Sequence, residues 1–294
     1  MKYLDPKADL TFKRVFGEHP DLVMSLLNAL LPLTAGQEIT DIEYLPSEMV
    51  PENPLRKNSI VDVRCKDKTG RQFIVEMQMI WSPEFKQRVL FNASKAYVRQ
   101  INAGEQYELL QPVYSLNLVN EVFEPELKGY YHHYQMVHVE NSDKVINGLQ
   151  LICVELPKFT PHTYSEKKMQ VLWLRYLTEI NERTREVPEE LMSNPEVKKA
   201  VNALEVSAFT DAQLAGYEKF WDIISTEKTL YNSAERKGMA AGIAQGIAQG
   251  IAQGKEEGKN EERDLIALNL KKQGIPFELI SQCTGLSVKE IELL

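Results

Sequence analysis

The chain of 294 residues predicts an α/β fold with an α-helical C-terminal extension. Its first half alternates between two patterns, which are apolar residues at helical spacing and short apolar runs bounded by turn residues. The second pattern is typical of strands. The second half has apolar residues at helical spacing only. A tail with a regular glycine repeat follows, and this change of composition marks a separate region.

The first half predicts three helices and five strands. Gly17 and Pro20 separate the first two helices, and Gly104 ends the third. A polar segment containing Gly70 joins the first two strands as a hairpin, because glycine adopts the positive φ of a tight turn. The helices are expected at Asp9–Phe16, Asp21–Leu31 and Pro83–Asn102, and the strands at Ile60–Val63, Phe73–Gln78, Pro112–Glu121, Tyr130–Val139 and Leu149–Leu156.

The second half predicts helices at Met169–Ile180, Glu189–Ala208 and Asp211–Arg236, and then at Glu261–Gln273, Pro276–Thr284 and Ser287–Leu294. Between these two groups, six glycines recur every four residues from Gly238 to Gly258. Each glycine weakens a helix interior by about 1 kcal/mol relative to alanine. The repeat is therefore a solvated helical linker, an oligomerisation arm or a disordered segment. The expected parts are a core at 1–160, a helical subdomain at 161–237, a glycine-repeat linker or helix at 238–260 and a small helical module, similar to a helix-turn-helix, at 261–294.

Each strand of the predicted hairpin carries an acid inside an apolar run, namely Asp62 and Glu76. A lone buried carboxylate is unfavourable unless a cation compensates it. Side chains alternate along a strand, so Glu76 and Gln78 share a face. A loop centred on Thr69 places Asp62 directly opposite Glu76, whereas a slip of one residue would turn Asp62 to the other face. In the first register the apolar residues share that other face, and they are Val61, Val63, Val75, Met77 and Met79.

Two carboxylates about 5 Å apart across a strand pair suit a hard divalent cation such as Mg²⁺. The amide of Gln78 adds a group that can hold a water molecule or a phosphate oxygen. A buried ion pair or a solvated strand face would produce the same pattern, and the spacing alone does not choose between these alternatives.

Asp62, followed by Glu76-Met77-Gln78 on the next strand, resembles the PD-(D/E)XK nuclease signature in its D…ExQ variant. The segment LDPKADLTFKRVFG, from Leu4 to Gly17, resembles the start of the Rpn family of recombination-promoting nucleases, which are also described as PD-(D/E)XK nuclease family transposases. The resemblance covers most of the chain, including the glycine repeat. This sequence departs from the motif in two places. Val61 replaces its Pro, and Gln78 replaces its usual Lys, which removes a positive charge.

The resemblance implies a PD-(D/E)XK restriction-endonuclease-like core, in which helices flank a central mixed sheet. It also implies DNA cleavage that depends on Mg²⁺ or another divalent cation and is linked to recombination or mobile elements. Asp62, Glu76 and the backbone carbonyl of Met77 would hold the metal, and Gln78 would position the attacking water. The predicted catalytic residues are therefore Asp62, Glu76 and Gln78. Asp9 is a further candidate metal ligand, because many such nucleases carry an acid on their first helix.

The net charge of the chain is −8, but residues 54–104 contain ten cations and four anions, a local balance of +6. Such a basic segment is typical of a polyanion-binding surface. On the helix at Pro83–Asn102, one face carries Arg88, Asn92, Lys95 and Arg99. This face is either solvated or a DNA-binding surface on which Arg88, Lys95 and Arg99 contact phosphates. The apolar residues on the other side are predicted to be core, and they include Leu90, Phe91 and Val98.

The amino-acid composition indicates the cellular compartment of the protein. The three cysteines, Cys65, Cys153 and Cys283, are widely separated and odd in number, which indicates a reducing compartment without disulfides. No apolar run reaches the ~20 residues of a membrane span, and the N-terminus lacks a signal-peptide pattern. We expect a cytoplasmic protein with no membrane partner.

Two other functions stay open at this point. A protein of the same fold, catalytically weak or inactive at Gln78, would bind nucleic acid without cleaving it. Alternatively, the chain is an assembly protein that forms a homo-oligomer through its C-terminal tail.

Overall fold

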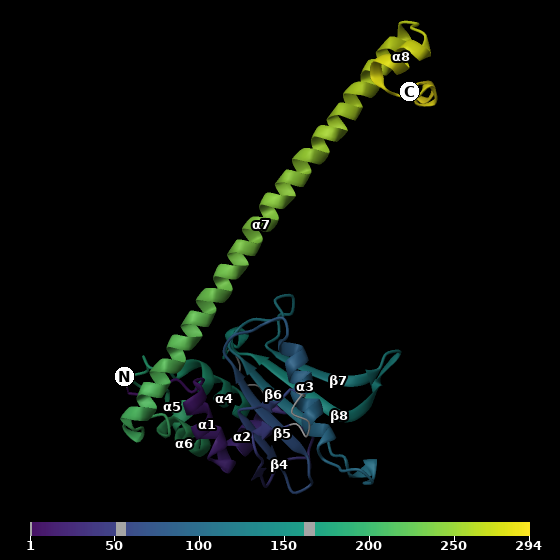
Figure 1. Cartoon of the computed structure of the whole chain (residues 1–294). Helices are drawn as coiled ribbons and strands as arrows, with labels where there is room; N and C mark the ends of the chain where they lie inside the picture. Colours follow the sequence, from purple (N-terminus) through teal and green to yellow (C-terminus); the bar gives the residue numbers. More distant parts are fainter. Residues whose placement is uncertain (1, 51–56, 162–167) are drawn as a thin grey trace. The chain divides into compact units, whose positions relative to one another are not determined.

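The computed structural model describes residues 2–50, 57–161 and 168–294, and the chain divides into two units, Met1–Thr226 and Glu227–Leu294 (Figure 1). The first unit is built on a six-stranded sheet with the order β1-β4-β5-β6-β8-β7. Its central strands β5, β6 and β8 are parallel, and the other neighbouring pairs are antiparallel. The expected central mixed sheet is therefore confirmed. The strands are β1 (Glu43–Tyr44), β4 (Val63–Lys66), β5 (Gln72–Gln78), β6 (Val113–Val119), β7 (Tyr131–His138) and β8 (Asn141–Glu155).

One face of the sheet packs against the N-terminal helices and the helices that follow β8. Phe12, Val15 and Phe16 form a buried stripe at helical spacing on α1, and Pro20 occupies the first turn of α2, where a missing N–H costs nothing. Phe16 packs on Trp173, with ring centroids 5.5 Å apart. The helices of this layer are α1 (Asp9–Gly17), α2 (Pro20–Leu30), α4 (Lys168–Glu179), α5 (Glu189–Met192) and α6 (Pro195–Asn202).

The other face of the sheet is covered by α3 (Phe85–Val98), which lies against β5, β6 and β8 (Figure 1). The helix does not bury the side that its large apolar residues predict. Leu90, Phe91 and Val98 are exposed by 48%, 42% and 64%. The buried residues are Phe85, Val89, Asn92, Ala93 and Ala96. Alanine lets the helix approach the sheet closely but carries little hydrophobic signal, so the predicted core side of this helix is wrong.

The hairpin of β4 and β5 has the register that places the two acids on one face. Val63 pairs with Val75 and Lys66 with Gln72, which continues to Asp62 opposite Glu76. The predicted first strand is, however, broken at Asp62. Residues before the break form β3 (Ser59–Ile60), which pairs with β2 (Glu48–Met49) in a separate two-stranded sheet. Val61 consequently packs with Ile74 on the α3 side and not with Val63, which corrects the expected apolar face.

The strands β7 and β8 form a hairpin that is longer than the sequence pattern indicates. Strand β8 begins at Asn141, eight residues before the predicted start at Leu149, and its first part is largely polar and exposed. It pairs with β7 through the backbone, with register shifts after Gln135 and Val137. Because backbone pairing needs no apolar side chains, the hydrophobic pattern does not reveal this extension.

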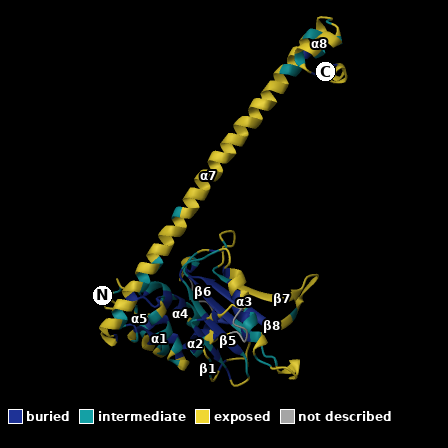
Figure 2. Cartoon of the chain, in the orientation of Figure 1, coloured by how far each residue is buried: buried dark blue, intermediate teal, exposed yellow. Residues whose placement is uncertain are grey.

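The remaining elements of the first unit are short. The predicted helix at Glu189–Ala208 is divided, because Asn194 and Pro195 begin a new helix, with the Asn194 side chain accepting from the Val197 N–H. Three 3₁₀ turns connect larger elements, and they are η1 (Tyr107–Leu109), η2 (Leu156–Lys158) and η3 (Val206–Ala208). Figure 2 shows the buried residues concentrated within the sheet and the helices on it.

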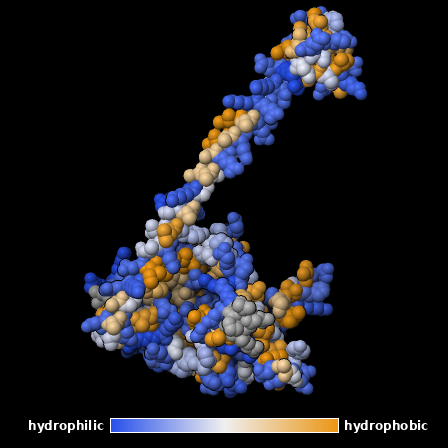
Figure 3. All heavy atoms as spheres, viewed as in Figure 1, coloured by the Kyte–Doolittle hydropathy of each residue, from blue (hydrophilic) through white to orange (hydrophobic). Residues whose placement is uncertain are grey.

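The second unit contains most of helix α7 (Asp211–Lys272), then α8 (Phe277–Thr284) and α9 (Val288–Leu293). The glycine repeat is helical and continuous with both neighbouring predicted helices. Its isoleucines at 243, 247 and 251 are 55–59% exposed, and Figure 3 shows apolar residues on the surface of this helix. A small core joins the end of α7 to the last two helices through Ala267, Ile280, Leu286 and Ile291. Among the described residues, none of the helices combines the length and apolarity that a membrane crossing requires.

Candidate active site

Asp62 and Glu76 are brought together where β4 ends and β5 continues. Beyond Val63 the backbone ladder stops, and the carboxylate of Asp62 accepts a hydrogen bond from the Met77 N–H at 2.8 Å. A side chain thus replaces the strand carbonyl that would otherwise pair with this N–H. Both acids are partly buried, and Gln78 follows two residues later on the Glu76 face. The hairpin therefore brings together all three predicted catalytic residues where β4 ends beside β5.

Helix α3 contributes a residue that the sequence did not single out as part of the site. The buried Asn92 donates from Nδ2 to Glu76 Oε1 at 2.9 Å, and its Oδ1 accepts from Ser59 Oγ at 2.6 Å. A chain of hydrogen bonds therefore connects β3, α3 and β5. Asn92 lies on the same helical face as the cations, but it is the neutral member of that face, and it turns inward to the carboxylate.

Burial controls the protonation of both acids. It raises the pKa of Glu76 to about 7, the negative charge of Asp62 adds to this rise, and the hydrogen bond from Asn92 opposes it. Burial also raises the pKa of Asp62, against the lowering effect of the Met77 N–H and of Lys13. The two carboxylates thus place negative charge in a partly buried environment, and a bound cation would stabilise that charge.

The chemistry of the donors fits a hard divalent cation. Mg²⁺ is typically held by one or two carboxylates and keeps several waters, and Asp62 with Glu76 provides those two carboxylates. No group of three or more His, Cys, Asp or Glu side chains suited to a metal occurs in the described part of the chain. Asp9 does not complete such a group, because it is half exposed and paired with Lys13 at 2.6 Å. Its charge nevertheless raises the pKa of Asp62, which indicates that it lies nearby.

The cations of α3 differ in their contacts. Arg88 donates to Gln78 Oε1, and the Gln78 amide donates to the Ile80 carbonyl. Lys95 donates to the Lys57 carbonyl at 3.0 Å, and Arg99 to the Val50 carbonyl at 2.6 Å. Among the described residues, none of these three cations forms an ion pair with a carboxylate. Arg56, another cation of the basic segment, lies outside the described residues.

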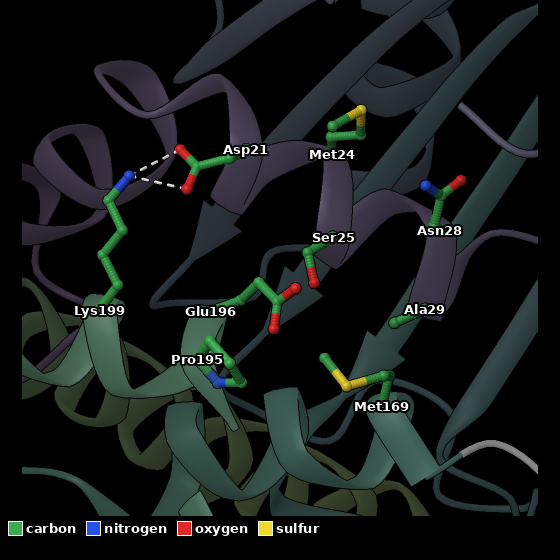
Figure 4. Close-up of a pocket in the computed structure, with 9 residues that line it drawn as sticks. All are labelled: Asp21, Met24, Ser25, Asn28, Ala29, Met169, Pro195, Glu196 and Lys199. Atoms are coloured by element: carbon green, nitrogen blue, oxygen red, sulfur yellow. Dashed lines mark hydrogen bonds and ion pairs between the residues drawn. The ribbon is translucent and has the colours of Figure 1, made fainter. Parts of the chain in front are cut away.

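A cavity lies away from these residues. It has a volume of about 570 Å³ and lies between α2, the start of α4 and α6, where Lys199 pairs with Asp21 at 2.7 Å (Figure 4). None of the predicted site residues lines it. The site on the hairpin is instead formed where β4 ends beside β5, an interior strand that is also paired with β6.

Comparison with known families agrees with this arrangement. Residues 6–230 match the family described as PD-(D/E)XK nuclease family transposase. The chain belongs to this family. The match includes both strands of the hairpin, α3 and the helices on the opposite face, so the PD-(D/E)XK fold expected from the sequence is confirmed. Neither the search of curated proteins nor that of solved structures found a match.

Proposed function

We propose that this PD-(D/E)XK family member is a metal-dependent DNA endonuclease that hydrolyses phosphodiester bonds in DNA recombination or in the movement of mobile elements. The observation that supports the proposal most is the placement of Asp62 and Glu76 on one face of the hairpin, with Glu76 held by Asn92. The two acids, with the Met77 carbonyl, would hold Mg²⁺ or another divalent cation. When bound, such a cation polarises the phosphate and lowers the pKa of water.

The residues of the chain have separate tasks in this proposal. Asn92 orients the Glu76 carboxylate and favours its ionised form, because a donor to the charged state lowers the pKa. Asp62 is oriented by the Met77 N–H. The Gln78 amide positions the attacking water. Arg88, Lys95 and Arg99 form no ion pair among the described residues, which favours DNA as the partner, since their charges would contact phosphates.

A plasmid-nicking assay in magnesium tests the proposal. Wild-type protein should cleave, and Asp62→Asn and Glu76→Gln should each lose cleavage while keeping the fold, because each keeps the shape and removes the charge. Glu43→Gln is the matched control, since Glu43 is an exposed acid on β1 that pairs only with Lys66 in the described region. Equal cleavage by wild type and both site variants, or cleavage that is unchanged by a chelator, would contradict the assignment.

One observation favours a second function. Gln78 is neutral where the motif usually has lysine, and this favours a protein of the same fold that binds DNA without cleaving it. The two functions differ in the same assay. A binding protein would retain DNA in a mobility-shift experiment and would leave plasmid intact at every magnesium concentration.

A further inference from the structure

We propose that Arg88 is a catalytic residue of this centre, and that its guanidinium contacts the phosphate under attack and provides the positive charge that Gln78 lacks. The inference rests on the proposed function. It assigns Arg88 a role in the chemical step, beyond that of a general contact to the DNA backbone.

The position of Arg88 supports this role. Arg88 lies in the first turns of α3 and reaches across to donate to Gln78 Oε1, so its guanidinium is anchored to the residue that occupies the lysine position. The side chain is exposed and also lies over the Phe85 ring at 5.9 Å. An anchored but exposed guanidinium is available to a ligand bound beside the end of β5.

The contact with Gln78 places Arg88 next to the residues of the motif. Gln78 is two residues from Glu76 on the same face of β5, and the Met77 N–H between them donates to Asp62. Arg88 forms no ion pair with a carboxylate in the described parts of the chain. In those parts its hydrogen bond is to Gln78 Oε1, so its other N–H groups are available to a ligand.

The other nearby cations are less suited to this task. Lys13 is paired with Asp9 at 2.6 Å. Lys95 lies near the end of α3 and Arg99 directly after it, and each donates to a backbone carbonyl of the segment before β4. Among the described cations, Arg88 combines a hydrogen bond to the motif residue Gln78 with an exposed side chain.

The chemistry explains why a cation is useful at this position. In the hydrolysis, the oxygen of a water molecule forms a bond to phosphorus while the bond from phosphorus to the leaving ester oxygen breaks. The water loses a proton to solvent, and the leaving oxygen takes up a proton, so the products are a phosphate monoester and an alcohol. Negative charge on the phosphoryl oxygens is retained throughout and redistributed in the transition state. A guanidinium presents two parallel donors to these oxygens.

The test is a comparison of kcat, KM and DNA binding for Arg88→Ala, Arg88→Lys and the double variant Gln78→Lys/Arg88→Ala. Lys86→Ala is the matched control, because Lys86 is another exposed cation of α3 but pairs with Glu124. Arg88→Ala should lower kcat by about 100-fold or more, as the loss of one transition-state donor typically does. Arg88→Lys should lie between Arg88→Ala and wild type, since the charge remains and the paired donors are lost.

The double variant decides the assignment. A lysine at 78 should restore at least about tenfold of the rate lost in Arg88→Ala, because it returns a cation to the same place. Arg88→Ala with unchanged kcat, a change in KM alone, or a double variant no faster than Arg88→Ala would each overturn the inference. Melting temperatures identify any variant that is simply unfolded, and Arg88→Lys then supplies the comparison. Cleavage by wild type that is lost in Asp62→Asn sustains the proposed function even if Arg88 proves dispensable.

Discussion

The raised pKa of Glu76 leads to a prediction about the stability of the protein, which can be tested without a substrate. In the metal-free protein, Glu76→Gln should stabilise the first unit at alkaline pH and have little effect at acidic pH. Burial raises the pKa of this carboxyl from 4.5 to about 7. At about 1.4 kcal/mol per pH unit, ionisation of Glu76 in the folded state corresponds to a destabilisation of up to about 3 kcal/mol.

The sign follows from proton binding. Below 4.5 the carboxyl is protonated in both the folded and the unfolded chain, and it imposes no penalty. Between 4.5 and about 7 the folded state keeps a proton that the unfolded state has released, so the free energy of unfolding falls as pH rises. Above about 7 both states are ionised and the full penalty persists. Glutamine cannot ionise, so Glu76→Gln does not lose this stability at high pH.

The assay is urea unfolding in a chelator, followed by the fluorescence of the buried Trp173, at about pH 4.5 and about pH 8.5. The difference between variant and wild type should be near zero at the lower pH and up to about 3 kcal/mol at the higher. Glu43→Gln, an exposed acid, should show no such pH dependence. A difference for Glu76→Gln that is the same at both pH values would refute the reasoning, because a packing effect does not titrate.

Three further predictions concern activity and binding. Gln78→Lys should retain or raise turnover at fixed magnesium, and a loss of more than about tenfold, or about 1.4 kcal/mol, would show that the amide does something a cation cannot. Replacing Arg88, Lys95 and Arg99 together should weaken DNA binding equally for all sequences. It should also flatten the log–log salt dependence of binding by about 0.9 per lost phosphate contact, measured in calcium or with Asp62→Asn; an unchanged slope would identify a merely solvated face. Asn92→Leu should raise the pKa of Glu76, so the acid limb of the kcat/KM profile should move to higher pH; lower activity with an unmoved limb would mean that Asn92 only supports the fold.

The sequence predicts the hairpin well because two requirements coincide in one register. Placing Asp62 opposite Glu76 also places Val63 and Val75 together in the core, and a slip of one residue would lose both arrangements. The helices at Asp9–Gly17 and Pro20–Leu30 are equally predictable, since their buried residues recur at helical spacing and proline marks a helix start.

The parts that the sequence predicts wrongly or leaves open share a physical cause, which is that large apolar side chains do not decide them. Ala93 and Ala96 settle which side of α3 faces the sheet because they are small, whereas Leu90 and Phe91 are larger and remain exposed. The inward turn of Asn92 depends on one hydrogen bond to Glu76. The sequence leaves the glycine repeat open between a helix and a disordered segment, because glycine weakens a helix interior, and the repeat is helical.

The hydrogen bond from the Met77 N–H to Asp62 has a consequence for relatives of this chain. Since the carboxylate serves as a strand partner, aspartate is useful here for the integrity of the sheet edge, whether or not catalysis occurs. A relative that no longer cleaves DNA would thus be expected to keep aspartate or asparagine at this position. The Glu76 carboxylate does not replace a backbone partner in this way, because its described hydrogen bond is to the Asn92 side chain. Whether a given member keeps the glutamate is therefore a better indicator of nuclease activity than whether it keeps the aspartate.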